Sequence, residues 1–322
     1  MAKTMMKSRK GPMLLSIIVP CHNEETVVDQ LAKTVFESIN IPETQLELIL
    51  VDDGSRDSTV EKLRALSAED SRIKYLSFSR NFGKEAAMYA GLQYANGDAV
   101  VIMDADLQHP PELVNEMVEH YREGFDQVVA RRTRDGDKPG RTFLSRVYYR
   151  LVNRMIDVPL EDGVGDFRLM SRQVVEAVLS MGEANRFSKG LFSWVGFKRY
   201  TIDYKNQARV GGGESKWSIR SLFNYGIDSV MSFNNKPLRF AIYTGLFFTF
   251  LALLYVIYLI ISALAYGVET PGYVTTVATI VFMGGLQIMF LGVLGEYVGR
   301  IYYETKHRPI FIVAESAGFD NQ

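Results

Sequence analysis

The sequence predicts an α/β domain, in which helices cover both faces of a mostly parallel sheet, followed by a pair of transmembrane helices. Short apolar runs alternate with segments of helical pattern from residue 14 to residue 130, and each apolar run is nearly continuous. Continuous runs are typical of parallel strands that are buried on both faces. The stretch 238–299 carries only three formal charges, Arg239, Glu269 and Glu296, which predicts the membrane helices.

The predicted elements of the α/β domain alternate regularly along the chain. The strands are expected at 14–19, 46–51, 73–78, 99–103 and 127–130. The helices between them are expected at about 23–38, 58–67, 84–95 and 111–123. In sheets of this kind, ligands bind beyond the carboxyl ends of the strands. Polar residues that directly follow the strands are therefore the candidate site residues.

The composition excludes several classes of protein. The 36 Lys and Arg residues balance 37 Asp and Glu residues, so the chain has no broad basic field for nucleic acid. Its one cysteine, Cys21, excludes an intramolecular disulfide framework. Hydrophobic residues make up 47% of the chain, which is too many for a disordered protein.

Two apolar runs, 240–266 and 273 to about 294, are each long enough to cross a bilayer as a helix. A buried pair of core helices is the alternative, and the length and low charge of the runs disfavour it. Lys and Arg flank the pair on its outer ends and are missing from the connection 267–272. The positive-inside rule therefore predicts that both termini are cytoplasmic. The flanking basic residues are Lys236, Arg239, Arg300, Lys306 and Arg308.

The sharpest polar motif is Asp104-Ala105-Asp106, which follows four apolar residues of the fourth predicted strand. Two carboxylates at a strand end can hold Mg²⁺ or Mn²⁺, with substrate phosphate oxygens as further ligands. The bound metal ion would neutralise a diphosphate leaving group. A solvated turn is the alternative for an isolated pair of this kind, and the position after a buried strand favours the metal site.

Three segments together resemble the inverting nucleotide-sugar glycosyltransferases of the GT-A class: 16–24 (SIIVPCHNE), 51–57 (VDDGSRD) and 103–110 (MDADLQHP). More narrowly, the chain resembles the polyisoprenyl-phosphate glycosyltransferases, a family that includes dolichol-phosphate mannose synthase and the bacterial bactoprenol, or undecaprenyl-phosphate, glycosyltransferases. The resemblance covers about residues 14–312 and implies a GT-A, Rossmann-like catalytic domain. Further matching segments are 80–83 (RNFG), 163–169 (GVGDFRL), 186–190 (RFSKG), 213–217 (GESKW) and 294–300 (LGEYVGR).

The resemblance also implies a role for each matched position. The uridine would be held by Pro20, His22, Glu24 and Asp53, although the family usually has Tyr where this chain has His22. Asp52 either shares this role or only caps the following helix. Asp104, Ala105 and Asp106 would contact the diphosphate, and Asp104, Asp106 and Gln108 the metal ion. Arg209 and Lys216 would close over the nucleotide. Arg132, Arg141 and Ser145 would bind the acceptor phosphate, since guanidinium groups bind phosphate bidentately.

By the same resemblance, Asp166 is the candidate general base. Because a phosphomonoester has a second pKa of about 6, the acceptor needs little deprotonation at neutral pH. Orientation of the sugar or the acceptor is therefore an alternative role for Asp166. A purely structural role, in which Asp166 pairs with Arg168, is a second alternative.

The implied reaction is metal-dependent transfer of one sugar, with inversion, from a UDP-sugar to undecaprenyl phosphate at the plasma membrane. UDP-N-acetylglucosamine is the first choice of donor and UDP-glucose the second. A processive polysaccharide synthase is a weaker alternative, because the chain lacks that class's Gln-x-x-Arg-Trp motif. A non-catalytic scaffold is disfavoured by the intact pair Asp104 and Asp106. The implied partners are the lipid bilayer, further copies of the chain, for example in a tetramer, a flippase and a second glycosyltransferase.

The predicted organisation has four parts. They are a cytoplasmic catalytic domain at 1–216, an interfacial amphipathic helix at 217–236, two transmembrane helices at 237–299 and a cytoplasmic C-terminal tail at 300–322. For the amphipathic stretch, ordinary packing against the catalytic domain is an equally open alternative.

Overall fold

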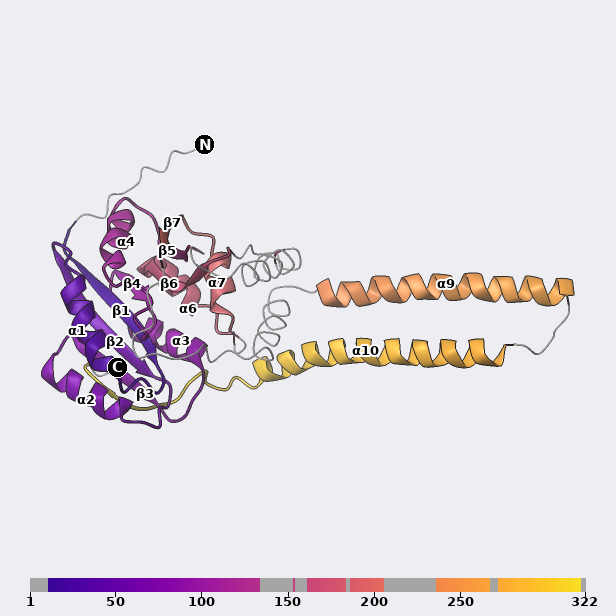
Figure 1. Cartoon of the computed structure of the whole chain (residues 1–322), viewed down its shortest axis with the longest axis horizontal. Helices are drawn as coiled ribbons and strands as arrows, with labels where there is room; N and C mark the ends of the chain where they lie inside the picture. The colour runs from indigo at the N-terminus through magenta and orange to yellow at the C-terminus, as the bar shows by residue number, and fades with distance from the viewer. Residues whose placement is uncertain are drawn as a thin grey trace.

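The computed structural model describes residues 11–133, 153, 161–183, 186–205, 236–266 and 272–319. They form an eight-stranded sheet with helices on both faces and two long helices that extend away from it (Figure 1). The predicted fold class is confirmed. Four predicted site residues, Arg141, Ser145, Arg209 and Lys216, lie outside the described residues, as does the predicted interfacial helix up to residue 235.

The first half of the α/β domain has the predicted alternation of strands and helices. Its strands are β1 (Met13–Cys21), β2 (Thr44–Asp52), β3 (Ile73–Phe78) and β4 (Ala99–Ile102). Its helices are α1 (Val28–Ser38), α2 (Thr59–Glu69), α3 (Lys84–Tyr94) and α4 (Leu113–Arg122). The second half contains β5 (Gln127–Arg132), β6 (Val164–Ser171), α6 (Arg172–Leu179), α7 (Ser188–Trp194) and β7 (Arg199–Tyr204).

The order of strands in the sheet is β7-β5-β6-β4-β1-β2-β3-β8. Strands β1 to β4 are parallel, so Cys21 lies beside Asp52, and Asp52 lies beside Ser77. Strand β6 is antiparallel to both of its neighbours, and its Arg168 lies beside Ile102 of β4. Because β6 runs in the opposite direction, its amino end lies at the same edge of the sheet as the carboxyl ends of β1, β2 and β4. That edge is where a ligand is expected.

Apolar side chains bury both faces of the sheet. Leu15 and Ile17 of β1 are completely buried in one cluster, together with residues of α1 and α4. Ile18 is completely buried in the other cluster, together with residues of α3 and α6. Each such side chain contributes about 1.5–3 kcal/mol to folding. Burial on both faces explains why the parallel strands are nearly continuous apolar runs in the sequence.

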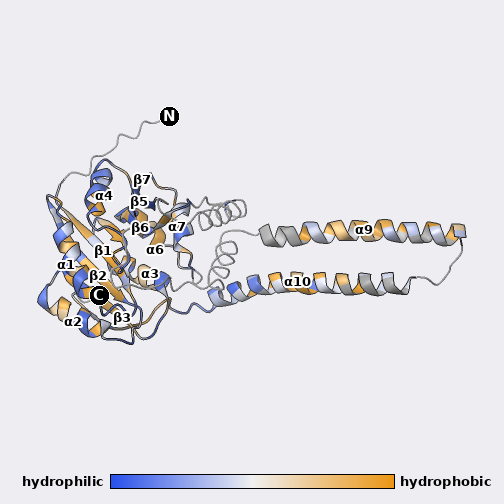
Figure 2. Cartoon of the chain, in the orientation of Figure 1, coloured by the Kyte–Doolittle hydropathy of each residue, from blue (hydrophilic) through white to orange (hydrophobic). Residues whose placement is uncertain are grey.

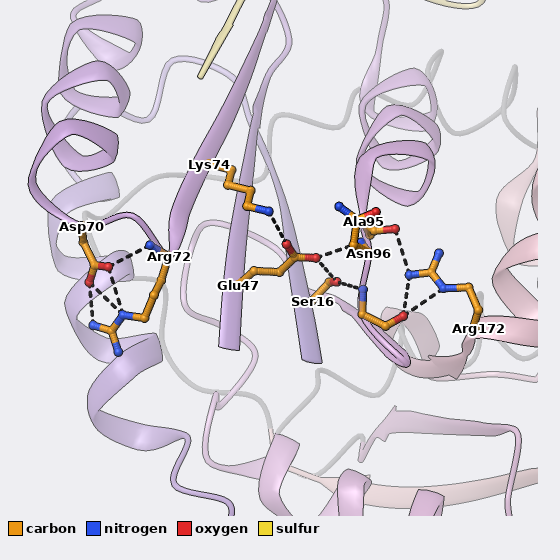
Figure 3. Close-up of polar contacts among 9 residues, drawn as sticks. Ser16, Glu47, Asp70, Arg72, Lys74, Ala95, Asn96 and Arg172 are labelled. Carbon is orange, nitrogen blue, oxygen red and sulfur yellow. Dashed lines mark hydrogen bonds and ion pairs between the residues drawn. The ribbon is translucent and has the colours of Figure 1, made fainter. Parts of the chain in front are cut away.

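A buried polar network lies at the amino ends of the strands (Figure 3). The carboxylate of Glu47 accepts hydrogen bonds from Lys74 Nζ at 2.7 Å, from the Ser16 hydroxyl and from the backbone N–H of Asn96 at 2.9 Å. These bonds tie β1, β2 and β3 to the turn that leads into β4. Because this network is at the opposite end of the strands from the predicted site, it serves the fold.

Helices α9 (Lys236–Tyr266) and α10 (Tyr273–Thr305) lie side by side (Figure 1). The rings of Phe248 and Phe282 are in contact, with centroids 5.4 Å apart. Figure 2 shows the apolar character of α9 and of the middle of α10, where they lie away from the α/β domain. Among the described residues, one segment, 282–305, is long and apolar enough to cross a membrane, and α9 contains a shorter apolar run at 242–255.

Helix α10 extends beyond the span predicted to end at about residue 294. Near its end, Arg300 donates hydrogen bonds to Glu296 Oε1 at 3.0 and 3.1 Å, as expected for residues four positions apart. A Cβ atom added at Gly295 or Gly299 would have no neighbour within 4 Å in the described part of the chain. The two glycines therefore do not mediate close packing against the described part of α9.

The chain that follows α10 returns to the α/β domain. Strand β8 (Val313–Ala317) pairs antiparallel with β3 and forms an edge of the sheet. The ring of Phe311 stacks on Phe78 of β3, with centroids 5.1 Å apart, and Arg64 forms an ion pair with Glu315 at 3.0 Å. The sequence predicts residues 300–322 to be a tail outside the catalytic domain. The structure instead places part of that stretch, β8, in the catalytic sheet.

Candidate active site

Acidic side chains from two strands meet at the predicted edge of the sheet. Asp104 follows β4, and Asp166 lies near the amino end of β6. The two carboxylates are linked by Lys84, the first residue of α3. Its Nζ atom lies 2.5 Å from Asp104 Oδ1 and 2.7 Å from Asp166 Oδ2. The ammonium group is therefore shared by two residues that the sequence predicts to be functional.

The charges of this cluster alter its titration. Burial alone would lower the pKa of Lys84, but Asp166 and Asp104 outweigh it, so the pKa lies above its ordinary value. Burial alone would raise the pKa of Asp166, but Lys84 above all holds that pKa well below its usual range. The second carboxylate oxygen of Asp166, Oδ1, is buried and has no hydrogen-bond partner among the described residues. An ionised carboxylate with one oxygen still able to accept a hydrogen bond suits a role in orienting a substrate hydroxyl.

His109 supports the loop that carries Asp104 and Asp106. The backbone N–H of Asp104 donates to His109 Nδ1 at 3.2 Å, so the ring proton is on Nε2, which lies 3.9 Å from Asp104 Oδ2. Burial lowers the pKa of His109, which favours the neutral ring. His109 is predicted from the sequence to be a bystander, whereas the structure shows that its ring accepts a hydrogen bond from the acidic loop.

Asp104, Asp106 and Gln108 were predicted to bind a metal ion. Asp106 Oδ1 accepts a hydrogen bond from the backbone N–H of Gln108 at 3.1 Å, which closes a tight turn after β4. The described residues contain no group of three or more His, Cys, Asp and Glu side chains arranged to hold a metal ion. Two carboxylates still fit Mg²⁺ or Mn²⁺ if a substrate diphosphate completes the coordination. In the structure, Asp104 is paired with the Lys84 ammonium group.

A cavity of about 570 Å³ lies beyond the carboxyl ends of β1, β2 and β3, and the residues of the acidic cluster are not among those that line it. It is lined by His22, Gly54, Ser55, Arg80 and Asn81, among others. His22 Nδ1 lies 2.9 Å from the backbone oxygen of Asp53, and the amide nitrogen of Asn81 lies 3.3 Å from His22 Nε2. The size and the polar wall of the cavity suit a nucleoside.

Three of the residues predicted to hold uridine, Pro20, Glu24 and Asp53, are not among those that line this cavity. The Asp53 carboxylate accepts hydrogen bonds from the backbone N–H groups of Phe82, at 2.6 Å, and Gly83, at 2.9 Å. Burial raises the pKa of Asp53. Asp53 therefore fixes the loop that leads into α3.

Asp52 also has a structural role, although it differs from the helix cap that was the alternative. Its carboxylate accepts a hydrogen bond from the Ser77 hydroxyl at 2.8 Å and from the backbone N–H of Ser55 at 3.2 Å. It therefore closes the turn after β2 and does not cap α2, whose N-cap residue is Ser58.

Of the residues predicted to bind the acceptor phosphate, Arg132 is the one that the structure describes. It ends β5, and its backbone N–H donates to Gly163 O at 2.9 Å, just before β6. The preceding residue, Arg131, is instead paired with Asp203 of β7 at 2.6 Å. Nearby, burial, followed by the charge of Asp104, raises the pKa of Tyr204 to about 12. The backbone hydrogen bond to Gly163 places the carboxyl end of β5, with Arg132, next to the amino end of β6, which carries Asp166.

Sequence reasoning missed Lys84, His109, Arg80 and Asn81. Arg80 and Asn81 belong to the RNFG segment that was matched as a motif, and Lys84 follows that segment directly. A lysine at the start of a helix, next to a matched motif, was the available signal. Its contact with Asp166 depends on the antiparallel direction of β6, which the sequence did not reveal.

Comparison with known proteins agrees with this geometry. The sequence profile described as glycosyl transferase family 2 matches residues 16–179, which include Asp52, Asp104 and Asp166. The chain belongs to glycosyl transferase family 2. A second profile, the GtrB C-terminal hairpin, matches residues 236–301, which cover α9 and most of α10.

Several known proteins are similar to this family 2 chain over nearly its full length. CsbB of Bacillus subtilis (strain 168), whose name specifies only a glycosyltransferase, is 48% identical over 94% of this chain and 92% of its own length. The bactoprenol glucosyl transferase of Shigella phage SfV is 41% identical over 94% of this chain and 98% of its own length. The SfII prophage-derived bactoprenol glucosyl transferase of Shigella flexneri is 40% identical over the same shares.

Among solved structures, a glucosyl-3-phosphoglycerate synthase from Mycobacterium tuberculosis is similar to this family 2 chain. That structure contains Mn²⁺, UDP-glucose and phosphoglyceric acid. It covers 68% of this chain and 78% of its own, with 19% sequence identity and a TM-score of 0.45.

Proposed function

We propose that this family 2 glycosyltransferase transfers one glucosyl group from UDP-glucose to undecaprenyl phosphate at the cytoplasmic face of the plasma membrane. The observation that carries the proposal is the combination, in one chain, of an acidic sheet edge with a C-terminal apolar hairpin. The hairpin profile and the full-length relatives named as bactoprenol glucosyl transferases support a lipid acceptor.

The choice of donor differs from the first expectation. UDP-N-acetylglucosamine was preferred on the sequence, and the comparisons do not support that preference. The relatives whose names specify a sugar are glucosyl transferases. We therefore place UDP-glucose first and keep UDP-N-acetylglucosamine as the competing donor in the test.

The residues of the site would share the work as follows. The cavity lined by His22, Ser55 and Asn81 would hold the nucleoside. Asp104 and Asp106, with Gln108 nearby, would hold Mg²⁺ or Mn²⁺, which would offset charge on the departing UDP. Asp166 would orient the sugar or the acceptor, and Arg132 would bind the acceptor phosphate. Most of the catalytic effect would come from placing two anionic substrates in line.

The residues outside the described part of the chain keep their expected roles in this proposal. Arg141 and Ser145 would join Arg132 at the acceptor phosphate, and Arg209 and Lys216 would cover the donor. The stretch 217–236 would lie along the membrane surface and bring the site to the level of the lipid headgroups. Further copies of the chain, a flippase and a second transferase would complete the pathway.

The activity is tested with the purified full chain, undecaprenyl phosphate, Mg²⁺ or Mn²⁺, and a panel of UDP-glucose, UDP-N-acetylglucosamine and UDP-galactose. Mass spectrometry of the extracted lipid should show the addition of one hexose with UDP-glucose as the best donor. D104N should abolish the product, whereas D29N, a matched change at an exposed ion pair with Lys62, should not. Failure to form lipid-linked sugar with any donor would refute the proposal, and preference for UDP-N-acetylglucosamine would refute the choice of sugar.

The proposed topology has both termini in the cytoplasm. The native Cys21 is buried, and burial raises the pKa of its thiol, so it should react slowly with maleimides. A V268C variant should therefore react in intact cells with a membrane-impermeant maleimide, whereas a D29C variant should react only after the cells are broken. The reverse pattern would contradict the assigned orientation.

A further inference from the structure

We propose that Lys84 is a positioning residue that exchanges with the divalent cation at Asp104. Before the nucleotide binds, its ammonium group would neutralise Asp104 and Asp166. The arriving metal–diphosphate would then displace it from Asp104 and leave it paired with Asp166. This inference rests on the proposed function, because it takes Asp104 as a metal ligand.

The geometry brings one cation to two carboxylates that have different expected partners. Lys84 Nζ lies 2.5 Å from Asp104 Oδ1 and 2.7 Å from Asp166 Oδ2. A metal ion held by Asp104 would seek the same carboxylate that now binds the ammonium group. Two cations on one carboxylate repel each other, so tight metal binding requires the ammonium group to move.

Lys84 is anchored at its backbone and able to move at its tip. The loop before it is fixed, since the N–H groups of Phe82 and Gly83 donate to the buried carboxylate of Asp53. The Lys84 side chain itself is 44% exposed, and its ammonium group is carried by a flexible chain of four methylene carbons. Its ammonium group can therefore leave Asp104 without any movement of α3.

Asp166 offers a position for the displaced ammonium group. The Asp166 side chain is only 12% exposed, and Lys84 is the residue that donates to its Oδ2. If Lys84 retained this single contact, Asp166 would stay ionised, and its Oδ1, which has no hydrogen-bond partner among the described residues, could accept one from a substrate. Lys84 would thus couple binding of the donor to the ability of the Asp166 carboxylate to accept a hydrogen bond from a substrate.

The exchange can be tested without any turnover by titrating the full chain in detergent with Mn²⁺. Electron paramagnetic resonance measures the concentration of free Mn²⁺ and hence its affinity for the protein. At a fixed concentration of UDP, which supplies the diphosphate, K84M should bind Mn²⁺ about tenfold more tightly than wild type, a size common for coupled sites. K84R keeps the charge and should bind as wild type does. K62M removes a lysine that is paired with Asp29 at the same distance of 2.5 Å, and it should have no effect. If K84M does not fold, K84Q serves the same purpose.

A second measurement separates positioning from simple structural support. With UDP-glucose and acceptor, K84M should reach half-maximal activity at a lower Mn²⁺ concentration than wild type, and its kcat should fall because Asp166 has lost its partner. A lysine that only stabilises the fold would leave the Mn²⁺ requirement unchanged.

Two results would overturn the inference, and they are distinguishable. If K84M binds Mn²⁺ no more tightly than wild type while D104N loses binding, Lys84 does not exchange with the metal, and the proposed function stands. If neither wild type nor K84M binds Mn²⁺, alone or with UDP, the metal site fails together with the exchange.

Discussion

The imidazole ring of His109 stacks on the phenyl ring of Phe167, with centroids 4.8 Å apart and planes inclined by 13°. Phe167 is next to Asp166 on β6, and His109 lies in the loop that carries Asp104. The contact therefore joins the two elements whose carboxylates share Lys84. Both rings are buried, so a packed pair of side chains lies beneath the acidic edge of the sheet.

Loss of this support should loosen the acidic loop. H109A removes the stacking and leaves the Asp104 N–H without its acceptor, which should lower the free energy of unfolding by about 2–3 kcal/mol. H109A should also weaken Mn²⁺ binding, because the loop that carries Asp104 is looser. H109F keeps a ring but not the hydrogen-bond acceptor, so it should be more stable than H109A but bind Mn²⁺ almost as weakly. Denaturant unfolding of the full chain and Mn²⁺ titration measure the two effects. Equal Mn²⁺ affinity in H109F and wild type would show that the hydrogen bond to Asp104 is dispensable.

The role of Asp166 can be read from pH dependence. Since Lys84 holds its pKa below the ordinary value of about 3.9, Asp166 should be ionised throughout the range from pH 5 to pH 8. D166N should lower kcat by about a hundredfold, while the rise in kcat/KM at about pH 6, which comes from the acceptor phosphate, persists. Disappearance of that rise in D166N would instead identify Asp166 as the titrating general base.

The network around Glu47 should make stability depend on pH. Burial alone would raise the pKa of Glu47, but hydrogen bonds from Lys74, Ser16 and the Asn96 N–H outweigh it and hold the pKa below the ordinary value. A lowered native pKa gives stability that is present above the unfolded pKa of about 4.3 and is lost as the pH falls through the native pKa.

E47Q is the variant that isolates this effect. At pH 7 it should be less stable than wild type by about 2–3 kcal/mol, because it leaves the Lys74 ammonium without its buried counter-charge. The difference should shrink as the pH falls below about 4.3. Unfolding curves of both proteins between pH 3.5 and pH 7 measure it. A difference that is constant across this range would mean that the charge of Glu47 does not contribute.

Gly54 should tolerate no side chain. Its φ is +63°, and an added Cβ would lie 2.3 Å from the carbonyl carbon of Arg80 and 2.6 Å from the backbone nitrogen of Asn81. G54A should displace the wall of the nucleoside cavity, weaken UDP binding at least about tenfold and destabilise the domain by about 2 kcal/mol or more. G182A is the matched control, since a Cβ there has no neighbour within 4 Å among the residues that the structure describes. UDP titration and thermal unfolding check both variants, and normal UDP affinity in G54A would contradict the expectation.

The segment after α10 should stabilise the catalytic domain. F311A removes the stacking on Phe78 and the edge contact with Tyr89, which should cost about 1–3 kcal/mol. I312A changes an exposed neighbour and should cost little. The rate of proteolysis of the α/β domain, used as a measure of its unfolding, distinguishes the two variants. Equal resistance of F311A and wild type would mean that the returning segment adds nothing to the domain.

The parallel half of the fold could be predicted because its strands are buried on both faces. Runs such as Ile17-Ile18-Val19 and Val100-Val101-Ile102 are typical of strands buried on both faces, and the polar residues that follow them marked the edge of the site. The beginning of α1 was predicted too early, at about residue 23, because the backbone N–H groups of Asn23 and Glu24 donate to the side chains of Ser55 and of Thr59, the first residue of α2, and the helix starts only at Val28.

The antiparallel strands could not be predicted in the same way. Strand β6 contains Gly165, Asp166 and Arg168, which interrupt its apolar pattern, and β8 has Glu315 and Ser316 among small residues. Both strands owe their place to neighbours that are distant in the sequence. The contact between Lys84 and Asp166 depends on the direction of β6, so it could not be recognised before the sheet was known.

The position of β8 has a consequence for how the protein is made. An edge strand of the catalytic sheet follows both apolar helices in the chain, so the ribosome completes the hairpin before it supplies that strand. Until the chain that follows α10 is synthesised, the edge of β3 that pairs with β8 stays uncovered. Pairing of β8 with β3 then completes the sheet and holds the end of α10 near the α/β domain, so this edge of the catalytic sheet can form only after both long helices have been synthesised.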